Sequence, residues 1–225
     1  MEPIAAPFYP IALSLEGRHC LLVGLGSVGL RKLSGLLPCA PASILALDTA
    51  LPSPNALPLL DDSRIRFERR SCTPEDIAGK TLVFAATDNK QENARIAELC
   101  RAVGVLCNSV TTPENGSFNV PAVARKGCLV ATISSDGASP ALIRRWCAEL
   151  EEWLVPRVRI AEVMRRLRPL VLRAEVNRRI FHDLADSPLQ YCLNKSYMRD
   201  CKALFMEKLP PELHEHIAEL LDDLP

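Results

Sequence analysis

Three glycines, Gly24, Gly26 and Gly29, follow a short apolar run and have the spacing Gly-x-Gly-x-x-Gly. A strand, a glycine-rich turn and a helix in that order form the fingerprint of dinucleotide-binding sites. The first glycine permits a tight turn, the second lets backbone amides approach a pyrophosphate, and the third lets the helix pack close to its strand. The positive end of the helix then faces the phosphates, so Ser27 and Val28 are expected to contact them.

An acidic residue, Asp48, ends the next predicted strand, Ser43–Leu47. It follows the fingerprint by about 20 residues, where the carboxylate that binds a ribose hydroxyl stands in such sites. No arginine or lysine occurs from Asp48 to Leu51, where a 2′-phosphate would be bound, so the sequence favours NAD over NADP. Thr49 is assigned to the same site. The alternative role for Asp48 is that of a solvated loop carboxylate.

Strands alternate with helices over the first half of the chain, which predicts βαβ units and a mostly parallel sheet. Ligands of such sheets bind beyond the carboxyl ends of the strands, so polar residues at those ends belong to one crevice with the glycine loop. These polar residues are Thr87, Asp88, Asn108 and Thr111.

The periodicity also predicts the remaining elements. Further strands are expected at 64–69, 81–86 and 105–107, a helix start at Thr73, and a helix at 90–103. After residue 112 the pattern changes to two strands, 118–124 and 129–134, and a helix at about 141–154. From Pro156 the chain is helical by pattern, and the last helix is expected to run from about Pro210 to Leu224.

The composition bounds the class of protein. The chain has 225 residues, with 27 basic and 27 acidic side chains, so charge gives no case for a nucleic-acid or membrane-surface partner. The nine cysteines contain no Cys-x-x-Cys and are expected to be core residues in a reducing cytoplasm. Apolar runs are too short for a membrane span. The four histidines form no cluster, so no metal site is predicted.

Several segments together resemble the precorrin-2 dehydrogenase family, the NAD-binding part of siroheme synthase. The segments with this resemblance are Leu21–Lys32, Phe84–Asp88, Cys107–Asn108, Ser117–Pro121 and Ile133–Pro140, in the order and approximate spacing of the family. The resemblance covers residues 8–150. The glycine fingerprint is shared with many dehydrogenases, whereas the Ser-Phe-x-x-Pro segment and the serine-rich loop before a helix are much more selective.

The resemblance implies an α/β fold in three parts and an activity. Residues 1–112 would form an NAD-binding Rossmann domain, 113–150 a small α+β dimerisation and substrate segment, and 151–225 a helical C-terminal domain. The activity implied is oxidation of precorrin-2 to sirohydrochlorin with NAD⁺ in siroheme biosynthesis, by a cytoplasmic homodimer. Some relatives also insert Fe²⁺.

One position departs from the family pattern. The family commonly carries an aspartate, implicated in dehydrogenation and in chelation, where this chain has Thr111. A threonine hydroxyl is no general base near neutral pH without a neighbour that takes its proton. Thr111 therefore either orients the substrate or passes a proton to a nearby carboxylate such as Asp88, Glu114 or Asp136. The substitution puts chelation in question more than hydride transfer.

Substrate contacts are assigned to the two selective segments and to the helix that follows them. They are Ser117, Phe118, Ser135, Asp136 and Arg144. The substrate carries many carboxylates, which basic side chains such as Arg144 would bind. The alternative for each serine is helix capping, and for Arg144 a solvated surface charge.

Two other functions compete with the dehydrogenase. One is a non-catalytic NAD-sensing module that acts on a partner through its C-terminal helices, which the loss of aspartate at position 111 favours. The other is an unrelated small-molecule dehydrogenase, against which stands the lack of an evident Lys, His or Tyr acid/base at the crevice.

Overall fold

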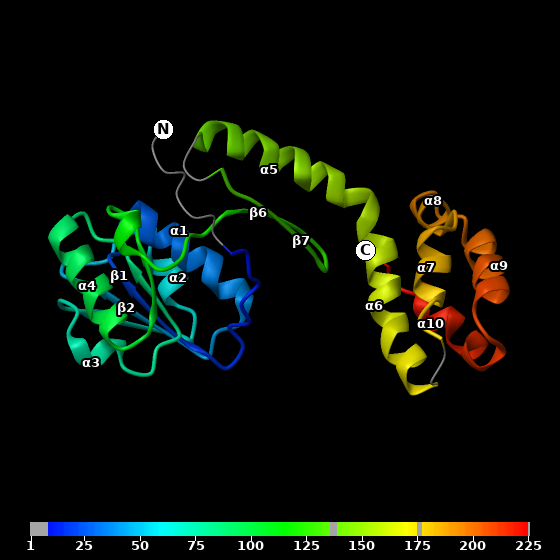
Figure 1. Ribbon diagram of the computed structural model, residues 1–225, viewed down its shortest axis with the longest axis horizontal. Coiled ribbons are helices and arrows are strands. Elements are labelled where there is room, and N and C mark those ends of the chain that lie inside the picture. The colour runs from blue at the N-terminus through cyan, green and yellow to red at the C-terminus, as the bar shows by residue number, and fades with distance from the viewer. Residues whose placement is uncertain (1–8, 136–138, 175–176, 225) are drawn as a thin grey trace. The chain divides into compact units, whose positions relative to one another are not determined.

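The computed structural model describes residues 9–135, 139–174 and 177–224, and the chain forms two compact units that divide between Val120 and Pro121 (Figure 1). Asp136, to which a substrate contact was assigned, lies outside the described residues. The division predicted from the sequence is finer, and its boundaries after residues 112 and 150 remain a prediction.

The first unit contains the predicted parallel sheet, with five strands in the order β3-β2-β1-β4-β5. The strands are β1 His19–Val23, β2 Ser43–Asp48, β3 Ile65–Arg69, β4 Leu82–Ala85 and β5 Leu106–Ser109. The connecting helices are α1 Ser27–Leu36, α2 Leu57–Leu60, α3 Pro74–Ile77 and α4 Lys90–Ala102, with short 3₁₀ turns at η1 Leu37–Cys39 and η2 Pro113–Asn115. The Rossmann-type fold is thereby confirmed.

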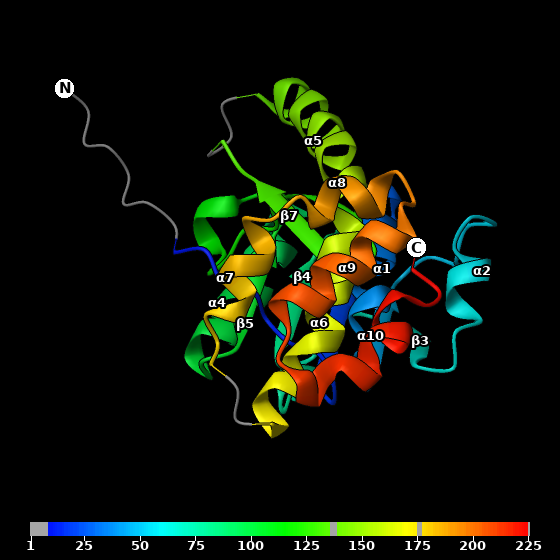
Figure 2. The same cartoon turned by 90° about the vertical axis from the view of Figure 1, so that its right-hand side faces the viewer.

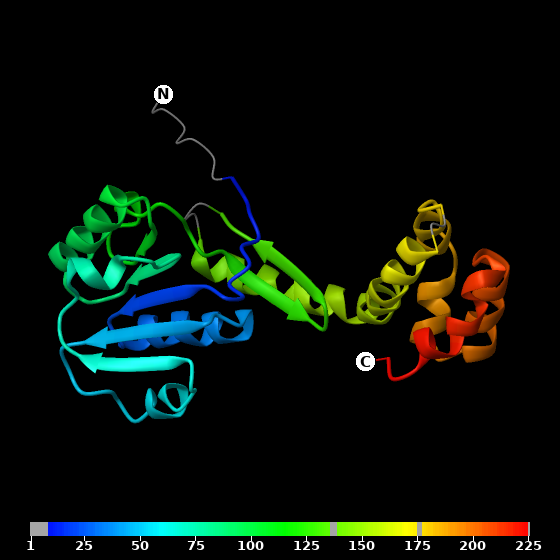
Figure 3. The same ribbon diagram turned by 90° about the horizontal axis from the view of Figure 1, so that it is seen from below.

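Apolar side chains on both faces of the strands explain the two helical layers. Alternate residues of β1 enter different cores, with Leu22 facing α1 and Leu21 facing α3 and α4. Both side chains are fully buried. All strands point the same way, so their carboxyl ends share one edge of the sheet (Figure 3). That edge is where the crevice residues gather.

The second unit pairs a hairpin with a helix and continues as a helical bundle (Figure 2). The hairpin strands are β6 Ala122–Lys126 and β7 Leu129–Ile133, and α5 Pro140–Leu154 packs against both. The bundle consists of α6 Val158–Arg173, α7 Ile180–Ala185, α8 Leu189–Asn194, α9 Met198–Lys208 and α10 Ile217–Leu221, with 3₁₀ turns η3 Val155–Arg157 and η4 Pro211–His216. Its core centres on fully buried Leu167, Leu184 and Phe205.

Three predicted elements differ from the structure. The strand expected at 118–124 begins only at Ala122, because Phe118 is held at β5, where its carbonyl accepts from the Asn108 side chain. The last helix is divided into η4 and α10, and its first turn closes as a 3₁₀ turn, from the Leu213 N–H to the Pro210 carbonyl three residues earlier. The short helix α2 lies between the second and third predicted strands, where the sequence analysis predicted no helix.

Among the described residues, none of the helices is long and apolar enough to cross a lipid bilayer.

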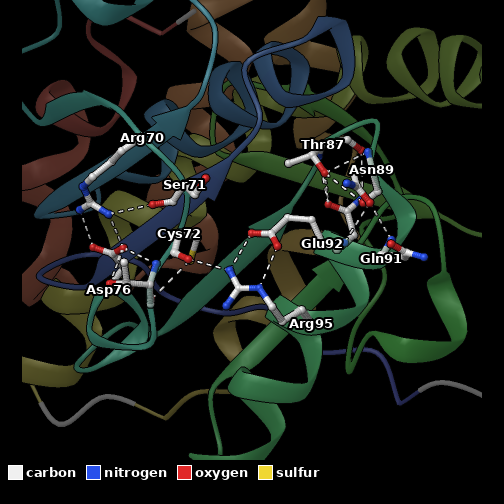
Figure 4. Close-up of polar contacts among 11 residues, drawn as sticks. Arg70, Ser71, Cys72, Asp76, Thr87, Asn89, Gln91, Glu92 and Arg95 are labelled. Carbon is white, nitrogen blue, oxygen red and sulfur yellow. Dashed lines mark hydrogen bonds and ion pairs between the residues drawn. The ribbon is translucent and has the colours of Figure 1, made fainter.

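A polar cluster fixes the connection between β3 and α4 (Figure 4). Both Asp76 carboxylate oxygens accept from the Arg70 guanidinium, at 2.6 and 2.7 Å, and one also accepts from the Thr73 N–H at 2.8 Å. The same Asp76 side chain completes the capping box of α3. Arg95 of α4 donates to the Cys72 carbonyl at 2.6 Å while it pairs with Glu92. These contacts tie α4 to the loop between β3 and α3.

The Arg70 guanidinium lowers the pKa of Asp76 from 3.8 to about 2. A pKa that is depressed in the folded state contributes stability above the unfolded value, and this contribution is lost as pH falls from about 4 towards 2. We expect Asp76→Asn to lower the free energy of unfolding by roughly 2 kcal/mol at pH 6 and by much less at pH 2.

Chemical denaturation of both proteins across this pH range measures the difference. The exposed carboxylate of Asp61 provides the control, because Asp61→Asn should leave the pH dependence unchanged. A deficit in Asp76→Asn that stays constant from pH 6 to pH 2 would contradict the assigned ion pair.

Candidate dinucleotide-binding site

Gly24 makes the turn at the end of β1 and can be no other residue without strain. Its φ of +97° lies in the left-handed region. A Cβ at this position would lie 2.5 Å from the Ala86 carbonyl oxygen, so the turn runs directly against the end of β4. The first glycine of the fingerprint thus brings β1 and β4 together at the crevice edge.

Gly26 and Gly29 differ in what surrounds them. A Cβ on Gly29 would lie 1.9 Å from the Gly24 carbonyl oxygen, so α1 packs against its own turn there. A Cβ on Gly26 would meet nothing within 4 Å. Gly26 is the N-cap of α1, and this cap has no side-chain hydrogen bond and no acidic residue in the first turn. The open space and the uncapped amides fit a pyrophosphate group.

Asp48 of β2 lies against the glycine loop. One carboxylate oxygen accepts from the Leu25 N–H at 2.6 Å, and the other accepts from the Ala50 N–H at 2.9 Å. Each oxygen retains a lone pair that a ribose hydroxyl could use. Asp48 is therefore more than a solvated carboxylate, because it also holds the loop. Arg69 of β3 donates to the Thr49 carbonyl at 3.0 Å, a contact that the sequence analysis did not predict.

Thr87 and Thr111, which the sequence assigned to one crevice, are joined by a single side chain. The Asn93 amide nitrogen donates to the Thr111 hydroxyl and to the Thr87 carbonyl, each at 2.9 Å. The Asn93 oxygen accepts from the Thr87 hydroxyl at 2.6 Å and from the Thr87 N–H at 3.1 Å. Asn93 is completely buried. It links the ends of β4 and β5, whereas Asp88 is exposed beside Thr87.

The sequence contained a signal for Asn93 that was missed. On α4 the buried positions are Asn93, Ile96, Ala97 and Cys100, the spacing of one helix face. An asparagine on an otherwise apolar face requires a hydrogen-bond partner inside the fold. That observation alone indicates a polar contact between α4 and the sheet.

Asn108 and Ser117 attach the chain after β5 to the sheet. The Asn108 amide nitrogen donates to the Phe118 carbonyl at 2.9 Å, and the Ser117 hydroxyl accepts from the Cys107 N–H at 2.8 Å. Phe118 packs edge-on against Phe84, with ring centroids 5.5 Å apart. Asn108 is almost completely buried, and its Oδ1 has no hydrogen-bond partner among the described residues. The cofactor contact assigned to Asn108 and the substrate contacts assigned to Ser117 and Phe118 remain predictions.

Ser135 and Arg144 belong to the second unit. The Ser139 hydroxyl accepts from the Leu142 N–H and caps α5, as expected for a serine before a proline. Ser135 accepts from the Ser139 N–H at 3.5 Å. Arg144 is exposed on α5. The substrate contacts assigned to Ser135 and Arg144 stay predictions.

The parallel sheet, the glycine turn, the uncapped α1 and the carboxylate at the end of β2 define a dinucleotide-binding protein of the Rossmann class. Residues 11–122 match the family model described as putative NAD(P)-binding. Siroheme synthase 2 of Aeromonas salmonicida (strain A449) is 37% identical over 152 residues, 67% of this chain and 30% of that protein. Siroheme synthase of Methylococcus capsulatus (strain ATCC 33009 / NCIMB 11132 / Bath) is 29% identical over 205 residues, 89% of this chain and 43% of that protein.

Among solved structures, SirC, precorrin-2 dehydrogenase, superimposes with a TM-score of 0.65 at 22% identity, covering 87% of this chain and all of that one. That likeness concerns the fold. The chain spans less than half of the length of the siroheme synthases it matches. Residues 11–122 thus carry a putative NAD(P)-binding domain, and the chain is similar to the NAD-binding part of siroheme synthases, the family that the sequence resembles.

Proposed function

We propose that this protein oxidises precorrin-2 to sirohydrochlorin with NAD⁺. The observation that supports it best is the open, uncapped start of α1 at Gly26 beside Asp48, in a chain that resembles this family. In the reaction the substrate loses two electrons as a hydride and one proton, and its conjugation is extended. NAD⁺ supplies the hydride acceptor and leaves as NADH, so the products are sirohydrochlorin, NADH and a proton.

The residues of the chain bind and orient in this proposal. The amides at the start of α1, those of Ser27 and Val28 included, hold the pyrophosphate, and Asp48 accepts from a ribose hydroxyl. Thr87 and Thr111 border the crevice near the reacting rings. Asp88, a carboxylate exposed next to Thr87, is the group we assign to accept the proton, because the Thr111 hydroxyl cannot do so alone.

Insertion of Fe²⁺ is left out of the proposal. The family aspartate would supply a carboxylate for the metal or for the pyrrole protons, and Thr111 supplies none.

Anaerobic incubation with precorrin-2, with and without NAD⁺, tests the proposal. We expect sirohydrochlorin and NADH to appear together, at equal rates, only when NAD⁺ is present. Binding of NAD⁺ without turnover would refute the dehydrogenase and favour the NAD-sensing module. Fe²⁺ or Co²⁺ added to the same cuvette tests chelation. NADP⁺ is compared as well, since Arg69 lies beside Thr49.

Replacing Asp48 with asparagine should weaken NAD⁺ binding. The new amide would present N–H donors to the Leu25 or Ala50 N–H and would lose the charge that favours a ribose hydroxyl. We expect the Kd for NAD⁺ to rise about tenfold, the loss of one charge-assisted hydrogen bond. Titration of NAD⁺ measures the change. Glu114→Gln, on the exposed turn after β5, is the control, and unchanged affinity in Asp48→Asn would refute the ribose contact.

We also propose that the apolar side of α5 binds a second copy of the chain. Leu142, Trp146 and Trp153 are 40%, 39% and 54% exposed, and they lie on one stripe of the helix at spacings of four and seven. Leu154 is the only residue of α5 that is buried. Exposed apolar stripes of this kind mark protein interfaces. A homodimer through this segment agrees with the resemblance.

Replacing Trp146 with glutamate should convert a dimer into a monomer, because the new charge would be buried without a partner. Ala148→Glu carries the same change on an exposed position away from the stripe and should leave the dimer intact. Sedimentation velocity of the three proteins measures the mass. A wild-type monomer, or a dimer that persists in Trp146→Glu, would contradict this proposal.

A cytoplasmic location remains a prediction.

A further inference from the structure

Asn93 is a buried polar side chain that hydrogen-bonds to two residues of the crevice, Thr87 and Thr111. It is 0% exposed and lies on the face of α4 that packs against the sheet. Its amide makes hydrogen bonds to four different groups, on Thr87 and Thr111. Both threonines follow strands at the edge where ligands bind. The bonds therefore join an interior residue to the reactive end of the site.

The orientation of the Asn93 amide is determined by its backbone partners. The Thr87 N–H can only donate, so the atom 3.1 Å from it must be the Asn93 oxygen. The Thr87 carbonyl can only accept, so the atom 2.9 Å from it must be the nitrogen. The nitrogen is then also the atom that faces the Thr111 hydroxyl, and it donates to that oxygen.

This orientation constrains the proton of Thr111. Because a lone pair of the hydroxyl oxygen already accepts from Asn93, the hydroxyl hydrogen must point elsewhere. Among the described residues no acceptor for it is found, and the Thr111 side chain is partly exposed. The hydroxyl therefore offers a donor towards the crevice.

We propose that Asn93 is a positioning residue that holds Thr111 as a hydrogen-bond donor to an oxygen atom of the bound ligand. This inference rests on the proposed function, since the ligand oxygen belongs either to the nicotinamide carboxamide or to a substrate carboxylate. Both are acceptors of the same kind. Thr111 thus binds and orients the ligand.

Two substitutions at position 111 test the donor while Asn93 keeps its three hydrogen bonds to Thr87. Thr111→Val removes the hydroxyl at nearly constant shape, and Thr111→Ser retains it. We expect Thr111→Val to raise either the Kd for NAD⁺ or the KM for precorrin-2 about fivefold to tenfold, the effect of one hydrogen bond. Thr111→Ser should restore most of the loss. The Kd for ADP-ribose, which lacks the nicotinamide, should not change.

A third substitution tests the role of Asn93. Asn93→Asp keeps the shape but replaces the donating nitrogen with oxygen, so the bond to the Thr87 carbonyl is lost and the Thr111 hydrogen would turn inward. In this background Thr111→Val should add less than twofold to the loss, because the donor has already been withdrawn. Asn89→Asp, four residues earlier on the same helix, is the matched control, since aspartate caps a helix as well as asparagine does.

The outcomes distinguish a failure of the Asn93–Thr111 inference from a failure of the proposed dehydrogenase function. Loss of NAD⁺ affinity but not of ADP-ribose affinity in Thr111→Val assigns the acceptor to the nicotinamide, and a change in KM alone assigns it to the substrate. Independent, additive losses in the double variant would reduce Asn93 to a purely structural residue and overturn the inference. If the wild type oxidises no precorrin-2, the proposed function fails. Equal NAD⁺ affinities of wild type and Thr111→Val would then overturn this inference separately.

Discussion

Replacing Gly26 with aspartate is expected to weaken NAD⁺ binding more than a hundredfold while leaving the fold intact. A side chain at position 26 meets nothing within 4 Å, and Gly26 is the N-cap of α1. Aspartate is among the best N-cap residues, so its carboxylate would accept from the first free amides of the helix. Those amides are the ones that a pyrophosphate needs, and the two negative charges would repel each other.

Gly26→Asp is therefore expected to preserve or raise the stability of the fold while it lowers the affinity for NAD⁺. The free energy of unfolding should stay the same or rise by a few tenths of a kcal/mol, because a cap is gained. The Kd for NAD⁺ should rise by two orders of magnitude or more, equivalent to about 3 kcal/mol. Calorimetric titration and chemical denaturation of the same preparation measure both quantities.

Two controls narrow the explanation. Gly35→Asp adds the same carboxylate to α1 at another open position, far from its start, and should leave NAD⁺ affinity unchanged. Gly26→Ala adds a Cβ without a charge and should lose much less affinity than the aspartate. Equal affinities of Gly26→Asp and wild type would remove the glycine loop from the cofactor site.

Gly24→Ala is expected to destabilise the fold more than Asp76→Asn does. The backbone there has φ of +97°, which costs an L-residue about 1–3 kcal/mol. The added Cβ would also lie 2.5 Å from the Ala86 carbonyl oxygen, and that oxygen belongs to backbone that cannot rotate away. We expect a loss of at least about 3 kcal/mol in the free energy of unfolding.

Gly17→Ala isolates the conformational part of this loss. Gly17 also has a positive φ, +71°, but nothing lies within 4 Å of its added Cβ. It should cost only about 1 kcal/mol. Thermal and chemical denaturation of both variants give the comparison. Equal losses in the two variants would mean that the contact between the first turn and the end of β4 contributes nothing.

The order of elements in the first unit could be predicted because each strand carries its own signal. Apolar runs such as Cys20–Val23 are short, bounded by turn residues and buried on both faces, which is what a central parallel strand requires. The predicted start of β6 was wrong, because residues with a strand-like local pattern hydrogen-bond to a strand elsewhere in the fold. Residues 118–121 alternate like a strand, but Ser117 and Phe118 bond to β5, so β6 starts at Ala122.

The candidate site divides in the same way. Glycine spacing and the carboxylate at the end of a strand predicted the loop and Asp48 as cofactor contacts because both signals are local, and these contacts remain predictions. The structure adds the hydrogen bond from the Leu25 N–H to Asp48. The sequence analysis did not predict that Asn93 and Arg69 contact the candidate site. Each reaches the crevice from another element, through bonds to Thr111 and Thr49 respectively.

The sequence by itself determined the strand and helix order, the glycine turn and the dinucleotide class of ligand, because backbone dihedrals and hydrophobic period are properties of neighbouring residues. Only the tertiary structure decided which glycine faces open space, which carboxylate holds the loop and which amide orients Thr111. Hydrogen bonds between residues 18 or more positions apart depend on how strands and helices pack, and no local pattern records that packing.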